Sequence, residues 1–259
     1  RNPKFNVSCH YLINRKGKTI QMVKDKNIAW HAGKSKWKNY NSLNKNSIGI
    51  EITNPEHNFG YKKYSKSQLS SVIKLCRYLA KKYNLYSKNF LGHSDIAPER
   101  KKDPGEKFPW KYLSKKNIGF WHKIKKNILL KNRNLETKDD EKKLFLRNLS
   151  KIGYSVKPQK NSKINRIKFL KIIVTVFQMR YRQELINGVI DQECLIISKD
   201  LGAGVGPPVA CPGESRPGVA FGVSSGVPRG VGRSGGRPRF SPCSQTRAVK
   251  RRCPQGAAA

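Results

Sequence analysis

Two short, mostly apolar runs of β-forming residues lie near the start of the chain, separated by a polar stretch, which is typical of β-strands. The runs are VSCHYLI at 7–13 and TIQMV at 19–23, and the residues between them, NRKGK, have the composition of a turn. Together they predict a β-hairpin. A third run, SIGIEIT at 47–53, places its isoleucines on one face of a strand and Glu51 on the other. A carboxylate opposite such a face lies at a sheet edge or in a cleft.

Helical spacing begins near residue 65 and predicts one long amphipathic helix. Ser65 and Gln68 form a capping-box pattern, and apolar residues then recur at helical intervals to about Tyr83. The segment NFLGH that follows at 89–93 predicts a short strand that ends in His93.

The same spacing returns at Asp139 and predicts a group of short helices. The first helix ends at Gly153 and Tyr154, a longer one extends to about Arg182, and the turn NGVID precedes a last helix. The apolar run FLKIIVTVF at 169–177 is about half the 18–20 residues needed to span a bilayer, so it predicts a buried helix.

Strands and helices mix without a regular strand–helix–strand repeat, which sets the expected fold class. We expect an α/β domain over residues 1–126, with a mixed central β-sheet flanked by helices. A linker at 127–138 and an all-α three-helix module at 139–201 follow. A module of about 60 residues is near the lower size limit for independent folding.

The composition changes at residue 202. More than half of the 21 glycines and 14 prolines lie in residues 202–259, where arginine replaces lysine. Such a tract buries too little apolar surface to offset its chain entropy, so we expect a disordered tail. The change in usage also suggests that the tail is foreign, through a frameshift or a joined reading frame.

The net charge is +38, from 54 Lys and Arg against 16 Asp and Glu. That charge suits a polyanion partner, but the lysine, asparagine and isoleucine of the first 200 residues are also typical of an AT-rich genome. No recognition helix or aromatic nucleotide platform accompanies the charge, so we expect no specific nucleic-acid partner. The six cysteines show neither zinc spacing nor a disulfide framework.

The candidate chemistry lies in GHSDIAPERKKDPG at 92–105. His93 and Asp103 are residue types that bind zinc, although such a pair also occurs by chance in loops. Lys101 could direct its charge at an oxyanion beside a metal, and Glu51 could take a proton from an activated water. The four side chains together favour metal-assisted hydrolysis.

Residues 5–115 closely resemble the N-acetylmuramoyl-L-alanine amidases of the AmpD and AmiD type, with the AmiD-like branch nearer. The stretches that carry the resemblance are, in order, NVSCHYLI, GKTIQMV, AWHAGKSKW, NSIGIEITN and GHSDIAPERKKDPGEKFPW. The last of these is highly specific. The resemblance implies a zinc cofactor and the amidase fold that is shared with peptidoglycan recognition proteins.

The resemblance also implies the roles of single residues. By motif position, His93 and Asp103 would be two zinc ligands, Glu51 the general base and Lys101 the stabiliser of the intermediate. The family's first zinc histidine lies on a strand of the form apolar-apolar-His-Tyr-Thr, and we expect this third ligand upstream of residue 1. His10 matches a different position, a histidine packed in the fold.

Two further positions are candidate substrate contacts. His31, in AWHAG, matches a position that lines the cleft, where it either contacts substrate or packs in the structure. Asn44 is the second candidate.

Residues 139–200 resemble the small peptidoglycan-binding module that follows the catalytic domain in AmiD-like proteins. The stretches KIGYSV, VFQMRYR and NGVIDQE carry this resemblance. Phe177 and Tyr181 also suit a plain helix core, because aromatic residues four positions apart on a helix usually pack inward.

The expected function is zinc-dependent hydrolysis of the amide between N-acetylmuramic acid and L-alanine in peptidoglycan, for cell-wall turnover or recycling. Muropeptides are the expected partners, and a monomer in the periplasm is expected, with peripheral or lipid-anchored outer-membrane association. The cytoplasm is the alternative location. The alternative function is a non-catalytic peptidoglycan-binding protein, because one expected zinc ligand is not found in the chain.

Overall fold

The computed structural model describes residues 7–55, 57–159, 162–204 and 218–224, and these described residues belong to one compact unit. The strands are β1 (Tyr11–Ile13), β2 (Thr19–Gln21), β3 (Lys36–Trp37), β4 (Tyr40–Asn41), β5 (Ser47–Thr53), β6 (Phe90–Gly92) and β7 (Gly218–Ser224). The helices are α1 (Lys66–Tyr83), α2 (His93–Ile96), α3 (Trp110–Ser114), α4 (Lys126–Asn132), α5 (Asp139–Ile152), α6 (Arg166–Tyr181) and α7 (Gln192–Ala203). Short 3-10 turns occupy Leu43–Lys45, His57–Phe59 and Ser87–Asn89.

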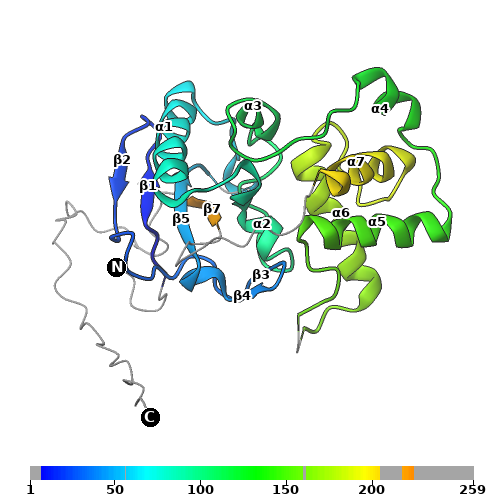
Figure 1. Ribbon diagram of the computed structural model, residues 1–259, viewed down its shortest axis with the longest axis horizontal. Coiled ribbons are helices and arrows are strands. Elements are labelled where there is room, and N and C mark those ends of the chain that lie inside the picture. Colours follow the sequence, from blue (N-terminus) through cyan, green and yellow to red (C-terminus); the bar gives the residue numbers. More distant parts are fainter. Residues whose placement is uncertain (1–6, 56, 160–161, 205–217, 225–259) are drawn as a thin grey trace, which may run out of the picture. The chain divides into compact units, whose positions relative to one another are not determined.

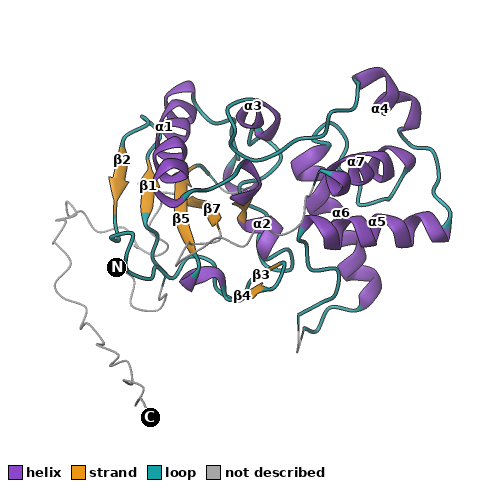
Figure 2. Cartoon of the chain, in the orientation of Figure 1, coloured by secondary structure: helices purple, strands orange, loops and turns teal. Residues whose placement is uncertain are grey.

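An α/β region comes first and a helical region follows it (Figures 1 and 2). The α/β region contains a five-stranded sheet in the order β2-β1-β5-β7-β6, and β3 pairs with β4 separately. The hairpin of β1 and β2 is antiparallel, whereas β5 pairs parallel with β1 and β7. The predicted hairpin and the mixed central sheet are thereby confirmed.

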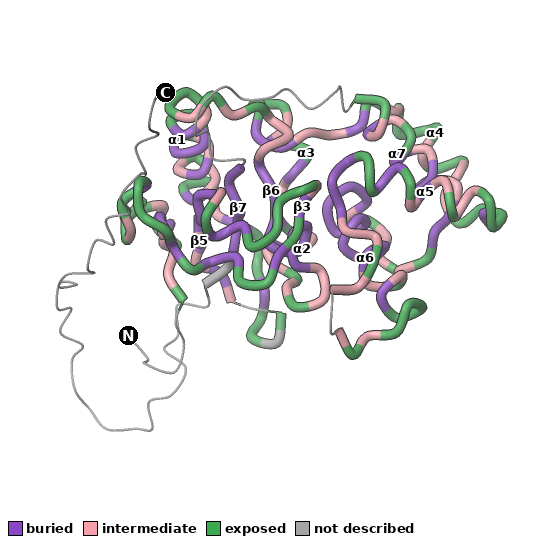
Figure 3. Tube along the Cα trace, turned by 60° about the horizontal axis from the view of Figure 1, so that its bottom comes forward, coloured by how far each residue is buried: buried purple, intermediate pink, exposed green. Residues whose placement is uncertain are grey.

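Strand β5 carries Glu51 in the middle of this sheet. Ile48, Ile50 and Ile52 are fully buried on one face, and Glu51 projects from the other. The sequence allowed two settings for Glu51, a sheet edge or a cleft. Because β5 has a partner strand on each side, the sheet edge is excluded. Figure 3 shows most residues of β5 and β7 coloured as buried.

Helix α1 begins and ends where the sequence predicts. Ser65 Oγ accepts a hydrogen bond from Gln68 N at 3.1 Å, and Gln68 Oε1 accepts one from Ser65 N at 3.1 Å, which completes the capping box. The helix ends at Tyr83, followed by Asn84 with a φ of 54°. The residues by which it packs against the isoleucine face of the sheet include Val72, Cys76 and Leu79.

A buried carboxylate, Asp25, joins the hairpin to the end of α1. Its Oδ1 accepts from Tyr11 OH at 2.6 Å, and its Oδ2 accepts from Lys82 Nζ at 2.9 Å and Tyr83 OH at 3.0 Å. Burial alone would raise the pKa of Asp25, but these hydrogen bonds outweigh it and lower the pKa below its ordinary value.

Replacement of Asp25 by asparagine is expected to lower the free energy of unfolding at pH 7 by about 2 kcal/mol, because an amide cannot accept from all these donors. A depressed pKa means that the stabilisation is present above the unfolded pKa, near 4, and is lost as the pH falls through the folded pKa. Urea unfolding at pH 7 and at pH 3 should therefore show a difference between the two proteins that shrinks at pH 3. Asp139→Asn, at an exposed carboxylate, is the control. A difference that stays constant with pH would contradict this account.

The helical region contains the three predicted helices, α5, α6 and α7, and α5 ends at Gly153 with a φ of 136°. The prediction of a linker at 127–138 is wrong for its first half, which forms α4. Leu129 of α4 packs against the core of the region, and this burial favours the helix. No helix of the described residues is long and apolar enough to cross a membrane.

Strand β7 corrects the expectation that residues 202–259 are disordered. Residues 218–224 lie between β5 and β6 and pair parallel with both. Val219 and Phe221 are fully buried in the isoleucine core, whereas Ala220 between them faces the other side. The tract is rich in glycine and proline as a whole, but this short piece alternates as a strand requires. The rest of the tract after α7 lies outside the described residues, and its foreign origin stays a prediction.

The α/β region and the helical region share one hydrophobic core. Leu91 and Ile96 from the first belong to the same buried cluster as Phe145 and Phe177 from the second. The packing between the regions is therefore continuous across the predicted boundary.

Candidate active site

Two strands of the sheet position the candidate site. Glu51 lies on β5, and His93 is the first residue of α2, directly after β6. The loop after α2 returns Asp103 to His93, where Asp103 Oδ2 lies 2.8 Å from His93 Nδ1. Asp103 O also accepts a hydrogen bond from Ser94 N at 2.8 Å. The structure thus joins the imidazole and the carboxylate that stand ten residues apart in the sequence.

Two buried tyrosines fix the return loop. Tyr61 OH and Tyr64 OH both donate to Pro104 O, at 2.6 Å and 2.8 Å. Gly105 follows with a φ of 82°, and a Cβ there would lie 2.6 Å from Tyr61 OH. Only glycine suits both this backbone conformation and this close approach. The position of Asp103 therefore depends on the buried tyrosines as well as on its own contact with His93.

His93 has one ring nitrogen without a protein partner. The residue is 1% exposed, and while Nδ1 contacts Asp103, Nε2 has no hydrogen-bond partner among the described residues. Burying an unpaired polar nitrogen costs free energy, so such atoms usually mark a place where something binds. An imidazole beside a carboxylate is a donor set that zinc accepts.

The acidic side chain near His93 is Glu51, and its protonation is altered by its surroundings. Burial raises the pKa of Glu51 to about 7, with the charge of Asp103 adding to the rise and His93 and Lys101 opposing it. A carboxyl group with a pKa near 7 can both take and release a proton at neutral pH.

The His93 and Asp103 pair responds differently to burial. Burial disfavours the charged form of each, but their mutual attraction and hydrogen bond outweigh it, so the pKa of His93 is raised and that of Asp103 is lowered. Asp103 therefore remains a carboxylate, which is the form that binds a metal ion.

Lys101 supplies the positive charge of the site. Its backbone N donates to Ala97 O at 3.0 Å, which holds it on the loop between His93 and Asp103. Its charge lowers the pKa of Glu51, His93 and Asp103 alike. The four residues predicted to carry the chemistry are therefore close enough to interact electrostatically.

The two histidines of the amino-terminal part pack beside the site. His10 Nδ1 accepts from Gly49 N at 3.0 Å, and its Nε2 lies 3.1 Å from Asn27 O, which is the packed role expected for it. The ring of His31 stacks on that of His93 with centroids 6.0 Å apart. His31 thus supports the imidazole of the site from one side.

Asn44 holds the turn after His31. Its Oδ1 accepts from Ala32 N at 2.7 Å and from Gly33 N at 3.3 Å. Because these contacts are internal and Asn44 is buried, the structure gives it a positioning role. Contact of His31 and Asn44 with substrate stays a prediction.

Strand β7 passes directly beside Glu51. Gly222 is its partner in register, and a Cβ at that position would collide with the Glu51 carboxylate. β7 therefore presents only backbone here. Across the described residues, no group of three or more His, Cys, Asp or Glu side chains is arranged to hold a metal ion. His93 and Asp103 stand as a pair, and the ligand expected upstream of residue 1 stays a prediction.

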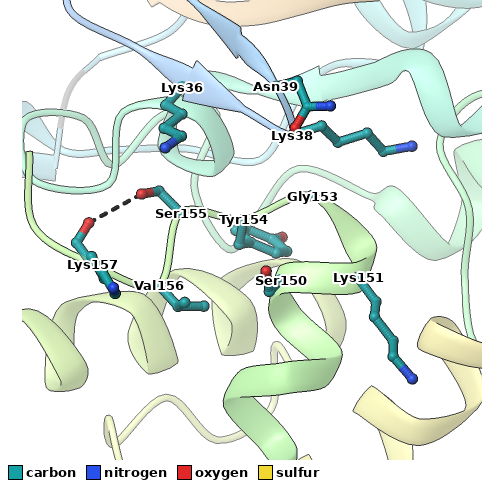
Figure 4. A pocket seen from close by; sticks show the side chains of 10 residues that line it. All are labelled: Lys36, Lys38, Asn39, Ser150, Lys151, Gly153, Tyr154, Ser155, Val156 and Lys157. Atoms are coloured by element: carbon teal, nitrogen blue, oxygen red, sulfur yellow. Dashed lines mark hydrogen bonds between the residues drawn. The ribbon is translucent and has the colours of Figure 1, made fainter. Parts of the chain in front are cut away.

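A hollow of about 450 Å³ lies apart from this chemistry, between the β3–β4 pair and the end of α5 (Figure 4). It is lined by four lysines and by none of the residues of the candidate site. The lining residues are Lys36, Lys38, Asn39, Ser150, Lys151, Gly153, Tyr154, Ser155, Val156 and Lys157.

Comparison with known proteins places the chain in a family. Residues 1–106 match the family model described as N-acetylmuramoyl-L-alanine amidase. The amidase AmiD of Escherichia coli K12 is 35% identical over 208 residues, which cover 75% of this chain and 73% of AmiD. This chain belongs to the N-acetylmuramoyl-L-alanine amidase family. The amidase AmpD of the same organism is 39% identical but covers only 41% of this chain and 56% of its own length, so the AmiD-like branch is the nearer one.

Solved structures of amidases share the fold. The complex of E. coli AmiD with anhydro-N-acetylmuramic acid-L-Ala-D-gamma-Glu-L-Lys has a TM-score of 0.65 at 33% identity, covering 76% of this chain and 79% of AmiD. AmpDh3 from Pseudomonas aeruginosa, in complex with anhydromuramic pentapeptide, has a TM-score of 0.64 at 30% identity, covering 76% of this chain and 82% of AmpDh3. The mixed α/β fold expected of an amidase is therefore confirmed.

Sequence reasoning missed one group of residues beside the site. Asp95 is 1% exposed and contacts two side chains of the helical region, Tyr154 and Arg180. The available signal was Arg180, which follows the largely apolar run at 169–177 in the same helix, because a charge that is buried needs a partner. The partner itself could not be chosen from the sequence.

Proposed function

We propose that this chain hydrolyses the amide bond between N-acetylmuramic acid and L-alanine in peptidoglycan. The observation that carries the proposal is the return of Asp103 to His93 beside the partly buried carboxyl group of Glu51, in a chain that belongs to the amidase family. Strands β5 and β6 both end near this point. Ligands of open α/β sheets commonly bind beyond the carboxyl ends of the strands.

Zinc is the proposed cofactor, and the residues present fit part of a zinc site. His93 and Asp103 offer nitrogen and carboxylate oxygen, and His93 has a buried nitrogen without a protein partner. Bound there, zinc would polarise the amide carbonyl and lower the pKa of a water molecule toward about 7. We place the third ligand upstream of residue 1.

Glu51 and Lys101 provide the proton transfer and the stabilisation of negative charge. Glu51 accepts the proton of the attacking water and passes it to the nitrogen of the leaving L-alanine, a transfer that suits its pKa near 7. Lys101 stabilises the negative charge that develops on the carbonyl oxygen.

The proposed substrates are muropeptides and murein. AmiD and AmpDh3 have been solved with anhydromuramyl peptides, and this supports a ligand of the same chemical class here. We propose that the helical region binds the wall and that the protein acts as a monomer in the periplasm, where murein is turned over. Peripheral or lipid-anchored association with the outer membrane, and recycling in the cytoplasm, are the other settings we consider.

A soluble anhydromuramyl tripeptide tests the proposal against the binding-protein alternative. We expect separate sugar and peptide on chromatography, loss of cleavage with a zinc chelator, and recovery on addition of zinc. Substrate that remains intact while the protein co-sediments with murein would favour the non-catalytic alternative.

A further inference from the structure

Arg180 of α6 crosses from the helical region into the α/β region. Its side chain is 2% exposed, and Nη1 donates to Asp95 Oδ2 while Nη2 donates to Phe90 O at 3.0 Å. The guanidinium group also lies over the Trp110 ring, 3.9 Å from its centroid. Nε has no hydrogen-bond partner among the described residues, but the charge itself is paired with Asp95, and an unpaired buried charge would be strongly destabilising.

Asp95 is the point at which these contacts meet the candidate site. It lies two residues after His93 on α2, and its Oδ2 also accepts from Gly92 N at 2.6 Å. Its Oδ1 accepts from Tyr154 OH at 2.7 Å. Asp95 therefore fixes the turn between β6 and α2, on which His93 is presented, and it is held in turn by two side chains of the helical region.

Tyr154 is itself held from the α/β side. Its ring meets that of Trp37 edge-on with centroids 4.9 Å apart, and Lys38 N donates to Gly153 O at 2.8 Å. Figure 4 shows Tyr154 between the end of α5 and the β3–β4 pair. The hydroxyl group is thus aimed at Asp95 by packing on both sides.

We propose that Arg180 and Tyr154 are positioning residues of the active site: they clamp Asp95 and so set the turn that presents His93. The inference deepens the proposed function and rests on it. It gives the helical region a second role, because the geometry of the catalytic turn then depends on residues beyond the α/β region.

Arg182 provides a matched control on the same helix. It is also fully buried, but its contacts stay within the helical region, where Nη1 donates to Asp191, Nε to Leu185 O at 3.0 Å and Nη2 to Asn187 Oδ1 at 3.1 Å. Its loss should disturb the helical core as severely as the loss of Arg180, but without touching the turn before His93.

The test compares hydrogen exchange and steady-state kinetics in the whole chain carrying Tyr154→Phe, Arg180→Met or Arg182→Met. We expect amides of residues 92–97 to exchange about 10–100-fold faster in the first two proteins and at the wild-type rate in the third. We expect kcat on a soluble muropeptide to fall about 10–100-fold at unchanged KM in the same two proteins only. If Arg180→Met does not fold, Tyr154→Phe decides, because it removes one hydroxyl group and keeps the ring.

Wild-type exchange or wild-type kcat in folded Tyr154→Phe would overturn the proposal, and so would equal changes in Arg182→Met. The exchange measurement needs neither substrate nor zinc. A chain without amidase activity would therefore refute the proposed function while the exchange of residues 92–97 still decides the clamp.

Discussion

Replacement of Glu51 by glutamine is expected to lower turnover of muropeptides by about 10²–10⁴-fold, because glutamine keeps the shape of the side chain but cannot accept the proton of the attacking water. The same change should leave the unfolding temperature equal or higher. Burial penalises the charged form of Glu51, as its raised pKa shows, and glutamine carries no charge. Steady-state rates and thermal unfolding of the two proteins separate these effects.

Glu106→Gln is the matched control for this change. Glu106 lies near the surface and pairs with His57 at 2.9 Å, so its loss should leave turnover within about twofold of wild type. Full activity of the Glu51→Gln protein would exclude Glu51 as the base and leave the proton transfer to another group.

Replacement of Asp103 by asparagine is expected to reduce both zinc content and turnover by more than about 100-fold. Loss of a residue that only orients a metal ligand lowers metal affinity or activity by about 10–100-fold. Loss of a ligand itself should lower both further. The carboxylate of Asp103 is also the main cause of the raised pKa of His93, so the pKa of His93 should fall in the asparagine protein. Metal analysis after dialysis, followed by activity on addition of zinc, measures the two effects.

Asp139→Asn serves as the control, because that carboxylate is exposed on α5 and pairs only with Lys142 at 3.0 Å. Zinc should restore the activity of chelator-treated wild-type and Asp139→Asn proteins, but not that of Asp103→Asn. An Asp103→Asn protein that retains one zinc ion and full turnover would show that Asp103 is no ligand.

Local patterns in the sequence predicted the elements that build the site. The alternation around Glu51 and the capping box at Ser65 are short-range signals, and each element formed where its own residues favoured it. The return of Asp103 to His93 was expected from resemblance to a family. Spacing alone could not show it, because a loop of that length can end in many places.

The errors arose where tertiary partners outweighed composition. Residues 218–224 lie in a tract whose average composition indicates disorder, yet Val219 and Phe221 are buried in a strand between two others. The role of Asp95 was missed for the same reason: its partners, Tyr154 and Arg180, lie more than fifty residues away in the sequence. Long-range contacts of this kind leave only weak local signals.

The most direct test of the central claim is mass spectrometry of murein digested, in water enriched in oxygen-18, by the protein with zinc and with the upstream residues that the proposed zinc site requires. Hydrolysis of the proposed amide would release stem peptides with a free L-alanine amino group and place one oxygen-18 atom in the lactyl carboxylate of muramic acid. The Glu51→Gln protein should give neither product. Uncut murein, or label in the peptide or at a glycosidic bond, would contradict the assignment of this chain as an N-acetylmuramoyl-L-alanine amidase.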